Sequence, residues 1–454
     1  MAPDSTTFDL LQSYRAMARV PPHRGTASFR LGNETFSGPA EFLLPPGSQA
    51  IIAFHAPADI ISPDFGRDLV IEGVFESGAF RIECAQICIR KPSRSADGGI
   101  CILISPINGP ARIYCRDDRP VRSVVALLNN FDLSCGDPVT SDGGWTTIDT
   151  PLSVDAGGRT ITFRQRADRP QLLQMVRAGL LHSTSLVEIA FDMLDGESDD
   201  DLLGFSADVA ALCTFAAGTG VSVAMLDLLD KEGAIVRRVV PQPVTSRYRY
   251  REIVADSDLR RLFSEAFAEY RRMKQAHAPW DTLASYCASL EDAPFLEQKF
   301  ASLVMAIEFF GRNCLIESGQ PVDRVMALDF AGLIGAGRKH LGWQVPKHYT
   351  TKETTRLLRN AVLHGGILPT ADNAEFRRLF DKWRLFLFRR VLIRLGYAGK
   401  VVSPHNGWAS TSDVADFSEE HNDFTPADSN AVHPWAELVK KLREQQACAE
   451  NKAS

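Results

Sequence analysis

The sequence predicts an α+β multidomain chain in which a β-rich N-terminal region, typical of an antiparallel sheet or sandwich, precedes an all-α helical bundle. Two observations lead to this prediction. Between residues 27 and 162, short β-branched or aromatic segments are separated by Gly, Pro and Asn, and several alternate with the period of two that strands show. After residue 251, apolar residues recur at helical spacing instead.

This change of periodicity divides the chain into four segments. Residues 1–165 form the β-rich domain, and residues 166–250 continue it with mixed α/β character. In the second segment we expect a helix over residues 206–219 and strands over 221–226 and 235–240. Residues 251–400 form the helical domain. Residues 401–454 are read as a polar tail with a short amphipathic helix near residues 434–446.

Five helices are expected in the helical domain. The first two are predicted by apolar residues at helical spacing: Leu259, Leu262, Phe263, Phe267 and Tyr270, then Leu296, Phe300, Leu303, Ile307 and Phe310. A third is expected over residues 322–340, where its glycines favour close packing or a broken end over a phosphate-binding loop. The fourth opens at Thr350 with Glu353 in a capping-box pattern and ends at Gly365. The fifth covers residues 373–395.

Charge and composition argue against several classes of function. The 454 residues include 50 Lys and Arg against 56 Asp and Glu, a net charge of -6, which argues against non-specific coating of nucleic acid or anionic lipid. The balance is uneven, because residues 251–400 carry +6 and the remainder carries -12. Neither a secretory signal nor a membrane-length apolar stretch is present, so we expect a soluble cytoplasmic protein without membrane contact.

Metal and cofactor sites find no support in the sequence. The nine cysteines are scattered, and the close pair Cys84 and Cys88 lacks a second pair at zinc spacing, so reduced and mostly buried thiols are expected. The acidic run from Asp195 to Asp201 lacks the Gly and distal Glu of a calcium loop and is read as an exposed turn. No metal and no cofactor is predicted.

The candidate chemistry lies in the hexapeptide Arg359-Asn360-Ala361-Val362-Leu363-His364. An Arg and a His five positions apart form a weak signal: chance alone predicts about one such pair, and the chain contains three. The other two pairs are Arg177 with His182 and Arg272 with His277. Only the third has a polar amide after the Arg, three apolar residues and Gly-Gly after the His, on a capped helix between two long ones.

This hexapeptide resembles the Arg-polar-x3-His signature of HEPN ribonucleases. The preceding segment LEQKFASLVMAIEFFGR, residues 296–312, resembles the long helix of the ApeA-like HEPN family of bacterial anti-phage defence. The resemblance covers roughly residues 251–400 and implies a HEPN-type bundle, a homodimer in which two motifs face one cleft, and RNA as substrate. For residues 1–250 it extends only to size, order and general character.

Cleavage of RNA without metal needs a group that takes the 2′-hydroxyl proton and a cation beside the phosphate. His364 can transfer protons near neutral pH, and Arg359 can stabilise charge on the phosphorane. Asn360 can orient the phosphate or the imidazole. In a regular helix Arg359 and His364 do not share a face, but the glycines after His364 let the chain bend back. By analogy with the family, the products are a 2′,3′-cyclic phosphate and a 5′-hydroxyl.

Each candidate functional residue also has a plausible structural role. Glu308 could orient Arg359 or His364, or could form an ion pair with Arg312 one turn later. Arg356 could bind RNA or lie on a solvated helix face. Trp343, His348 and Tyr349 could stack an unpaired base, although packing is the commoner role for such residues. Arg359 itself could close a helix-end ion pair, and His364 could act as a C-terminal cap.

The sequence therefore predicts an anti-phage defence protein whose HEPN domain is a metal-independent endoribonuclease, with catalytic Arg359, Asn360 and His364. Its expected partners are RNA, such as tRNA, a second copy, and a phage-derived trigger recognised by the N-terminal region. Two alternatives stay open. One is a non-catalytic HEPN-like module for RNA binding or dimerisation with a partner-sensing β-rich domain. The other is a regulator that acts by sequestration.

Overall fold

A computed structural model describes the following parts of the 454-residue chain. They are residues 23–31, 34–43, 51–56, 69–75, 78–84, 87–94, 100–106, 110–115, 119–133, 136–141, 144–179, 181, 183–241, 253–276, 279–290, 293, 295–345, 373–403, 410–415 and 444. Within these ranges, no helix is long and apolar enough to cross a membrane.

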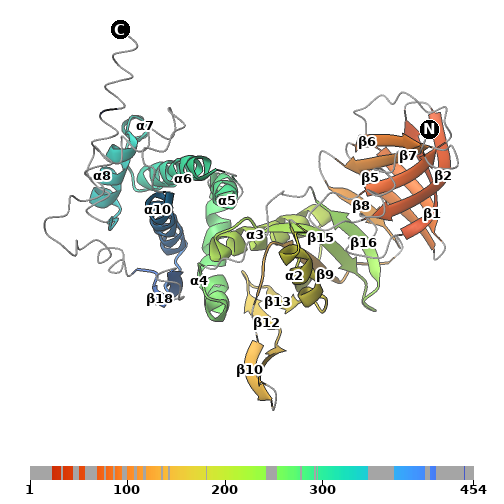
Figure 1. Ribbon diagram of the computed structural model, residues 1–454, viewed down its shortest axis with the longest axis horizontal. Helices are drawn as coiled ribbons and strands as arrows, with labels where there is room; N and C mark the ends of the chain where they lie inside the picture. Colours follow the sequence, from red (N-terminus) through yellow and green to blue (C-terminus); the bar gives the residue numbers. More distant parts are fainter. Residues whose placement is uncertain are drawn as a thin grey trace, which may run out of the picture. The chain divides into compact units, whose positions relative to one another are not determined.

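The chain forms two compact units, and strands and helices are both abundant (Figure 1). Unit 1 comprises residues 1–211 and 221–250, and unit 2 comprises residues 212–220 and 251–454. The predicted mixed α+β class is therefore confirmed. The finer division at residues 165, 250 and 400 stays a prediction.

Unit 1 contains a 14-stranded sheet with the order β12-β13-β14-β9-β15-β16-β8-β5-β4-β1-β2-β3-β7-β6, in which every described pairing is antiparallel. A separate hairpin pairs β10 with β11. The strands are β1 (His23–Leu31), β2 (Glu34–Leu43), β3 (Ile51–Ala56), β4 (Leu69–Phe75), β5 (Gly78–Cys84), β6 (Ile87–Arg94), β7 (Ile100–Pro106), β8 (Ala111–Tyr114), β9 (Ser123–Asn129), β10 (Gly136–Ser141), β11 (Gly144–Asp149), β12 (Leu152–Asp155), β13 (Thr160–Gln165), β14 (Val187–Asp192), β15 (Ser222–Leu229) and β16 (Ile235–Val240).

The core of unit 1 lies around β9, β14 and β15. Strand β14 alternates buried and less buried residues along VEIAFD, as expected of a strand with one covered face. Two helices accompany these strands: α2 (Arg169–Arg177) and α3 (Asp199–Ala217). Phe191 of β14 packs edge-to-face against Phe205 of α3, with ring centroids 5.0 Å apart. The expected strands near residues 221–226 and 235–240 correspond to β15 and β16.

The acidic run after Asp195 begins a helix. The Ser198 hydroxyl accepts the Asp201 N–H at 3.2 Å, and Asp201 Oδ2 accepts the Ser198 N–H at 2.9 Å, which is a reciprocal cap of the helix start. Asp199 and Asp201 thus lie in the first turn of α3, where carboxylates favour the positive end of the helix dipole. The predicted exposed turn is confirmed at Asp195 and Gly196, but the helix expected from residue 206 starts seven residues earlier.

Unit 2 is built mainly from helices (Figure 1). After a 3₁₀ turn, η1 (Asp256–Asp258), they are α4 (Leu259–Ala276), α5 (Pro279–Ser289), α6 (Leu296–Glu317), α7 (Val322–Met326), α8 (Phe330–His340) and α10 (Asn373–Arg394). All five residues that predicted the first helix are buried on α4. The helix expected to open at Thr350 lies outside the described residues.

The prediction of one continuous helix over residues 322–340 is wrong. The chain forms α7 and α8 instead, because Asp329 caps a new helix start: its Oδ1 accepts the Gly332 N–H at 2.7 Å. The five-residue α7 ends before this cap. Helix α5 was not expected either, although Pro279 at its first position is a typical helix start.

The segment read as a tail begins with ordered structure. Two short strands, β17 (Lys400–Ser403) and β18 (Ser410–Asp413), pair antiparallel, and the Val402 N–H donates to the Ile253 carbonyl at 2.8 Å. Arg389 of α10, which is fully buried, donates to Ser412 Oγ at 2.6 Å and to the Asp413 carbonyl at 3.3 Å. The predicted amphipathic helix near residues 434–446 lies outside the described residues, apart from residue 444.

An ion-pair network joins three helices of unit 2. Arg394 of α10 contacts Glu317 of α6 at 2.7 Å and Glu269 of α4 at 3.1 Å, and Arg272 contacts Glu269 at 2.6 Å. Hydrogen bonds from Arg272 and Arg394 hold the pKa of the Glu269 carboxyl below its ordinary value of 4.5. A carboxyl whose pKa is lowered by folding stabilises the fold above its unfolded pKa and loses that effect as the pH falls.

Replacing Arg394 by Met is therefore expected to lower the free energy of unfolding at neutral pH by about 1 kcal/mol, since the network is partly exposed. The difference from wild type should shrink as the pH falls below 4.5. Urea unfolding across this pH range measures it. Arg338→Met, at an exposed position of α8, is the control. An Arg394→Met defect of constant size at every pH would show that the lost contacts are not ionic.

Candidate functional site

The proposed catalytic residues Arg359, Asn360 and His364 lie outside the described residues, as do Arg356, His348 and Tyr349. Their predicted roles stay predictions. What the structure does describe is the chain on both sides of this segment. Residues 341–345 lead into it, and α10 follows it. The supporting residue Glu308 is also described.

Glu308 occupies the middle of α6 and is 9% exposed. Its Oε2 accepts from Arg312 Nη1 at 3.0 Å, one helical turn later, and Arg312 Nη2 donates to the Leu328 carbonyl at 3.2 Å. The ion-pair alternative for Glu308 is thus observed. This pair also ties α6 to the chain between α7 and α8. An additional role in orienting Arg359 or His364 is untested, since those residues are not described.

Trp343 is firmly packed near the end of the described stretch 295–345. Its ring is 6% exposed, lies parallel to the Phe310 ring with centroids 6.2 Å apart, and meets the Phe386 ring edge-to-face at 5.5 Å. The backbone N–H of Trp343 donates to the Gly337 carbonyl at 3.1 Å. Packing is therefore the role of Trp343, and base stacking by this residue is excluded by its burial.

Two glycines make room for the Trp343 ring. A Cβ atom on Gly337 of α8 would overlap the Trp343 indole, and one on Gly311 of α6 would come within 2.9 Å of it. Gly335, by contrast, has open space where a Cβ would point. The sequence reading of these glycines as a sign of close packing is confirmed at Gly337. Its cause, a tryptophan from the following segment, was not visible in the sequence.

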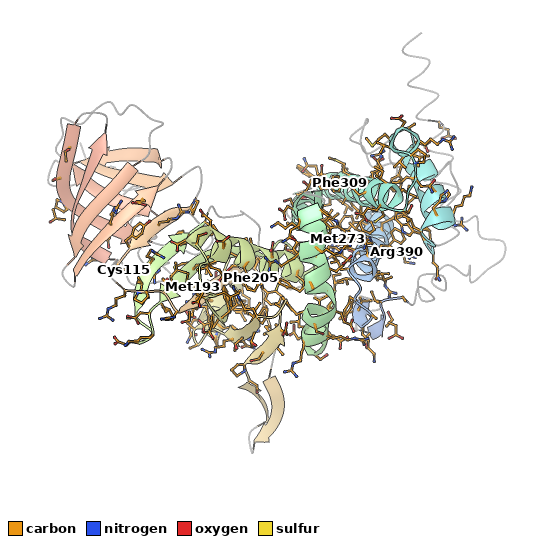
Figure 2. All side chains as sticks on the ribbon, turned by 180° about the vertical axis from the view of Figure 1, so that it is seen from behind. Cys115, Met193, Phe205, Met273, Phe309 and Arg390 are labelled. Carbon is orange, nitrogen blue, oxygen red and sulfur yellow. The ribbon has the colours of Figure 1, made fainter. Side chains whose placement is uncertain are left out.

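Arg390 of α10 fixes the next residue of the same segment. Its Nη2 donates to the Gln344 carbonyl at 3.2 Å, and its guanidinium lies 5.5 Å from the centre of the Phe386 ring. Figure 2 labels Arg390 on this helix. Trp343 and Gln344 are therefore held by hydrogen bonds to α8 and α10 and by ring contacts with α6 and α10. Sequence reasoning missed Arg390 because a buried arginine leaves no periodic signal.

The burial of α10 arginines changes how the basic charge of residues 251–400 is read. Arg384, Arg389 and Arg390 are between 0% and 8% exposed, and each donates to a carbonyl oxygen of the protein. Arg384, for example, donates to the Gly218 carbonyl at 2.6 Å. These three arginines add to the +6 balance of residues 251–400 but contribute little charge to the surface. They serve the fold, and the basic surface left for a polyanion is correspondingly smaller.

Three of the described thiols are too deeply buried to act as nucleophiles, whereas Cys115 is only partly buried. Cys213, Cys287 and Cys314 are buried, and burial raises the pKa of the Cys287 and Cys314 thiols to about 12. The expectation of reduced, buried cysteines is confirmed for these three. Among the described residues, no group of three or more His, Cys, Asp or Glu side chains is placed to hold a metal ion.

Comparison with known proteins adds no relative from which a function can be taken. No family model matches the chain, no curated protein matches it, and no solved structure matches it. The candidate site therefore rests on the Arg359–His364 sequence pattern, and the structure describes Glu308, paired with Arg312, and the packed Trp343 in the same unit.

Proposed function

We propose that the chain is an anti-phage defence protein that cleaves RNA without a metal ion, through Arg359, Asn360 and His364. The observation that carries the proposal is the hexapeptide RNAVLH, which joins a proton-transfer group, a bidentate cation and a polar amide within six residues. The motif lies in the helical unit, between α8 and α10 in sequence, and it was selected over two other Arg-x4-His pairs of the chain by the residues that surround it.

In the proposed reaction, His364 takes the proton of the 2′-hydroxyl, whose oxygen attacks the adjacent phosphorus. Arg359 stabilises the charge that develops on the phosphoryl oxygens, and Asn360 orients the phosphate or the imidazole. The bond from phosphorus to the 5′-oxygen of the next nucleotide breaks, and that oxygen takes a proton from water. The products are a 2′,3′-cyclic phosphate and a 5′-hydroxyl. The N-terminal unit recognises the phage-derived trigger, and the substrate is tRNA or another structured RNA.

Two assays test the proposal together. Purified full-length protein is incubated with total tRNA in EDTA, and the termini of any products are determined. In parallel, the protein is overproduced in bacterial cells, where activation by a cellular or phage factor is also possible. We expect cleavage with cyclic phosphate termini and growth arrest. Intact RNA combined with normal growth would contradict the proposal.

The buried arginines of α10 favour a second candidate, a helical module without catalytic activity that binds a partner or a second copy. Three arginines that add to the positive balance of residues 251–400 make their hydrogen bonds within the protein itself. This alternative predicts that Arg359→Ala and His364→Ala leave the cellular phenotype unchanged, whereas substitutions on a docking surface abolish it. A sequestering regulator would instead co-purify with its target and cleave no RNA.

A further inference from the structure

The last turn of α8 carries two neighbouring cations, Arg338 and Lys339, which we call the α8 pair (Figure 1 labels α8). Both side chains are exposed. Among the residues that the structure describes, neither side chain makes an ion pair or a hydrogen bond. Helix α8 contains no Asp or Glu, so the positive charge of the pair is not offset within its own helix.

Most other described cations of unit 2 already have partners. Four arginines contact a carboxylate within 3.2 Å: Arg272, Arg312, Arg377 and Arg394. Three more are the buried arginines of α10. Arg324 and Lys400 are exposed and make no ion pair in the described part of the chain, but each is the sole cation of its element. Exposed positive charge without a protein partner is therefore concentrated at the α8 pair, as far as unit 2 is described.

The pair lies on a fixed turn beside a flat helix face. Gly337, directly before it, lies against the Trp343 ring. The Gly337 carbonyl accepts the backbone N–H groups of Leu341 and Trp343, at 2.9 and 3.1 Å. One turn before the pair, Gly335 is exposed and has open space where a side chain would begin, and Ala331 lies a further turn back. This face of α8 therefore lets the backbone of a ligand come close to the two cations.

The exposed face of α8 suits a polyanion better than a protein partner. Protein interfaces are centred on large apolar or aromatic side chains, but the large apolar residues of α8, Phe330, Leu333 and Ile334, are all buried. Arg and Lys side chains are the main contacts to the phosphates of a nucleic-acid backbone. The negative end of the helix dipole also favours cations at this position. That role alone predicts a loss of stability, and not of RNA affinity, when the pair is removed.

We infer that the α8 pair binds the phosphate backbone of RNA. The choice of RNA as the polyanion rests on the proposed function, whereas the surface itself is argued from α8 and the residues packed against it. The pair is a binding site and takes no part in the chemical step. Because it contacts phosphates and not bases, its contribution to affinity is independent of sequence and falls as the salt concentration rises.

The test is the affinity of the full chain for labelled tRNA, measured by fluorescence anisotropy at several salt concentrations. Every protein in the series carries His364→Ala, so that the RNA stays intact. Arg338→Ala/Lys339→Ala is expected to raise Kd about tenfold or more at about 0.1 M salt, and to flatten the slope of log K against log salt by about 1 to 2. Lys400→Glu changes the net charge by the same amount at an exposed position of β17, and should change Kd by less than about threefold. Circular dichroism melting checks that both variants are folded.

Equal affinity and an equal salt slope with and without the pair would overturn the inference, as would a parent protein that does not bind tRNA at low salt. A poly-glutamate peptide that bound as tightly as tRNA would indicate a site for acidic proteins and would also overturn it. If the pair proves necessary for RNA binding but the chain with His364 intact cuts no RNA, the proposed function is contradicted and the binding site stands. Cleavage of RNA by a chain in which the pair does not affect affinity would be the reverse case.

Discussion

Replacing His364 by Ala is expected to slow RNA cleavage in EDTA by about 100-fold to 10,000-fold, the range that a general acid–base group contributes. Replacing Arg359 by Ala should cause a loss of about 100-fold or more, because the charge that builds on the phosphate loses its cation. Both variants should keep the thermal stability of wild type. Single-turnover cleavage of a labelled RNA measures the rates, and circular dichroism checks the fold.

The chain offers a matched control for each substitution. Arg272 belongs to another Arg-x4-His pair, but the structure shows it in a two-point contact with Glu269 on the same helix, at 2.7 and 2.6 Å. His340 is exposed at the end of α8. Arg272→Ala and His340→Ala are expected to cleave RNA at the wild-type rate. If His364→Ala and His340→Ala were equally active, the catalytic assignment would be wrong.

Gly337→Ala is expected to lower the free energy of unfolding of unit 2 by about 3 kcal/mol, at the upper end of the usual cost of overpacking. The added methyl group would overlap the Trp343 indole, which is itself confined by Phe310 and Phe386. The ring cannot move aside without breaking these contacts. We expect the melting temperature to fall by roughly 5–10 °C.

Gly335→Ala supplies the matched control two residues earlier on α8. A Cβ there has open space, so the better helix propensity of Ala should leave stability unchanged or raise it by up to about 1 kcal/mol. Thermal unfolding of both variants measures the contrast. If both glycines tolerated Ala equally, the packing of Trp343 against α8 would be incorrect.

The sequence predicted those helices of unit 2 that bury one continuous apolar face. Helix α4 is the clearest case, because Leu262, Phe263 and Tyr270 recur at helical spacing and are all buried. Helix α6 follows the same rule with Phe300, Leu303 and Ile307. Periodicity is a local property of the sequence. A helix with an apolar face can therefore be predicted without knowing which elements it packs against.

The features of the fold that could not be predicted from the sequence depend on specific side-chain contacts, several of them between distant residues. The break between α7 and α8 follows from one cap by Asp329, which outweighs an apolar pattern that continues through it. The burial of Arg389 depends on β18, more than twenty residues later, whose carbonyl and hydroxyl groups receive its hydrogen bonds. For the same reason, the +6 balance of residues 251–400 does not show which arginines reach the surface. Such long-range pairing has no signature in spacing or composition.

For the candidate site, the sequence supplied the motif, and the structure supplied part of its surroundings. Glu308 was selected because a carboxylate interrupts an apolar helix face, and the structure places it in a pair with Arg312. The anchoring roles of Trp343 and Arg390 became visible only in three dimensions. Trp343 illustrates the difficulty, because an aromatic residue beside a motif suggests base stacking until its burial is known.

In the proposed reaction, RNA is cut by transfer of the phosphate to the neighbouring 2′-oxygen. The most direct measurement is the chemistry of the RNA ends produced by the purified wild-type protein in EDTA. We expect 2′,3′-cyclic phosphate and 5′-hydroxyl ends, and no cut wherever the 2′-oxygen is methylated. Cleavage that continues at 2′-O-methylated positions, or that leaves 3′-hydroxyl and 5′-phosphate ends, would contradict it.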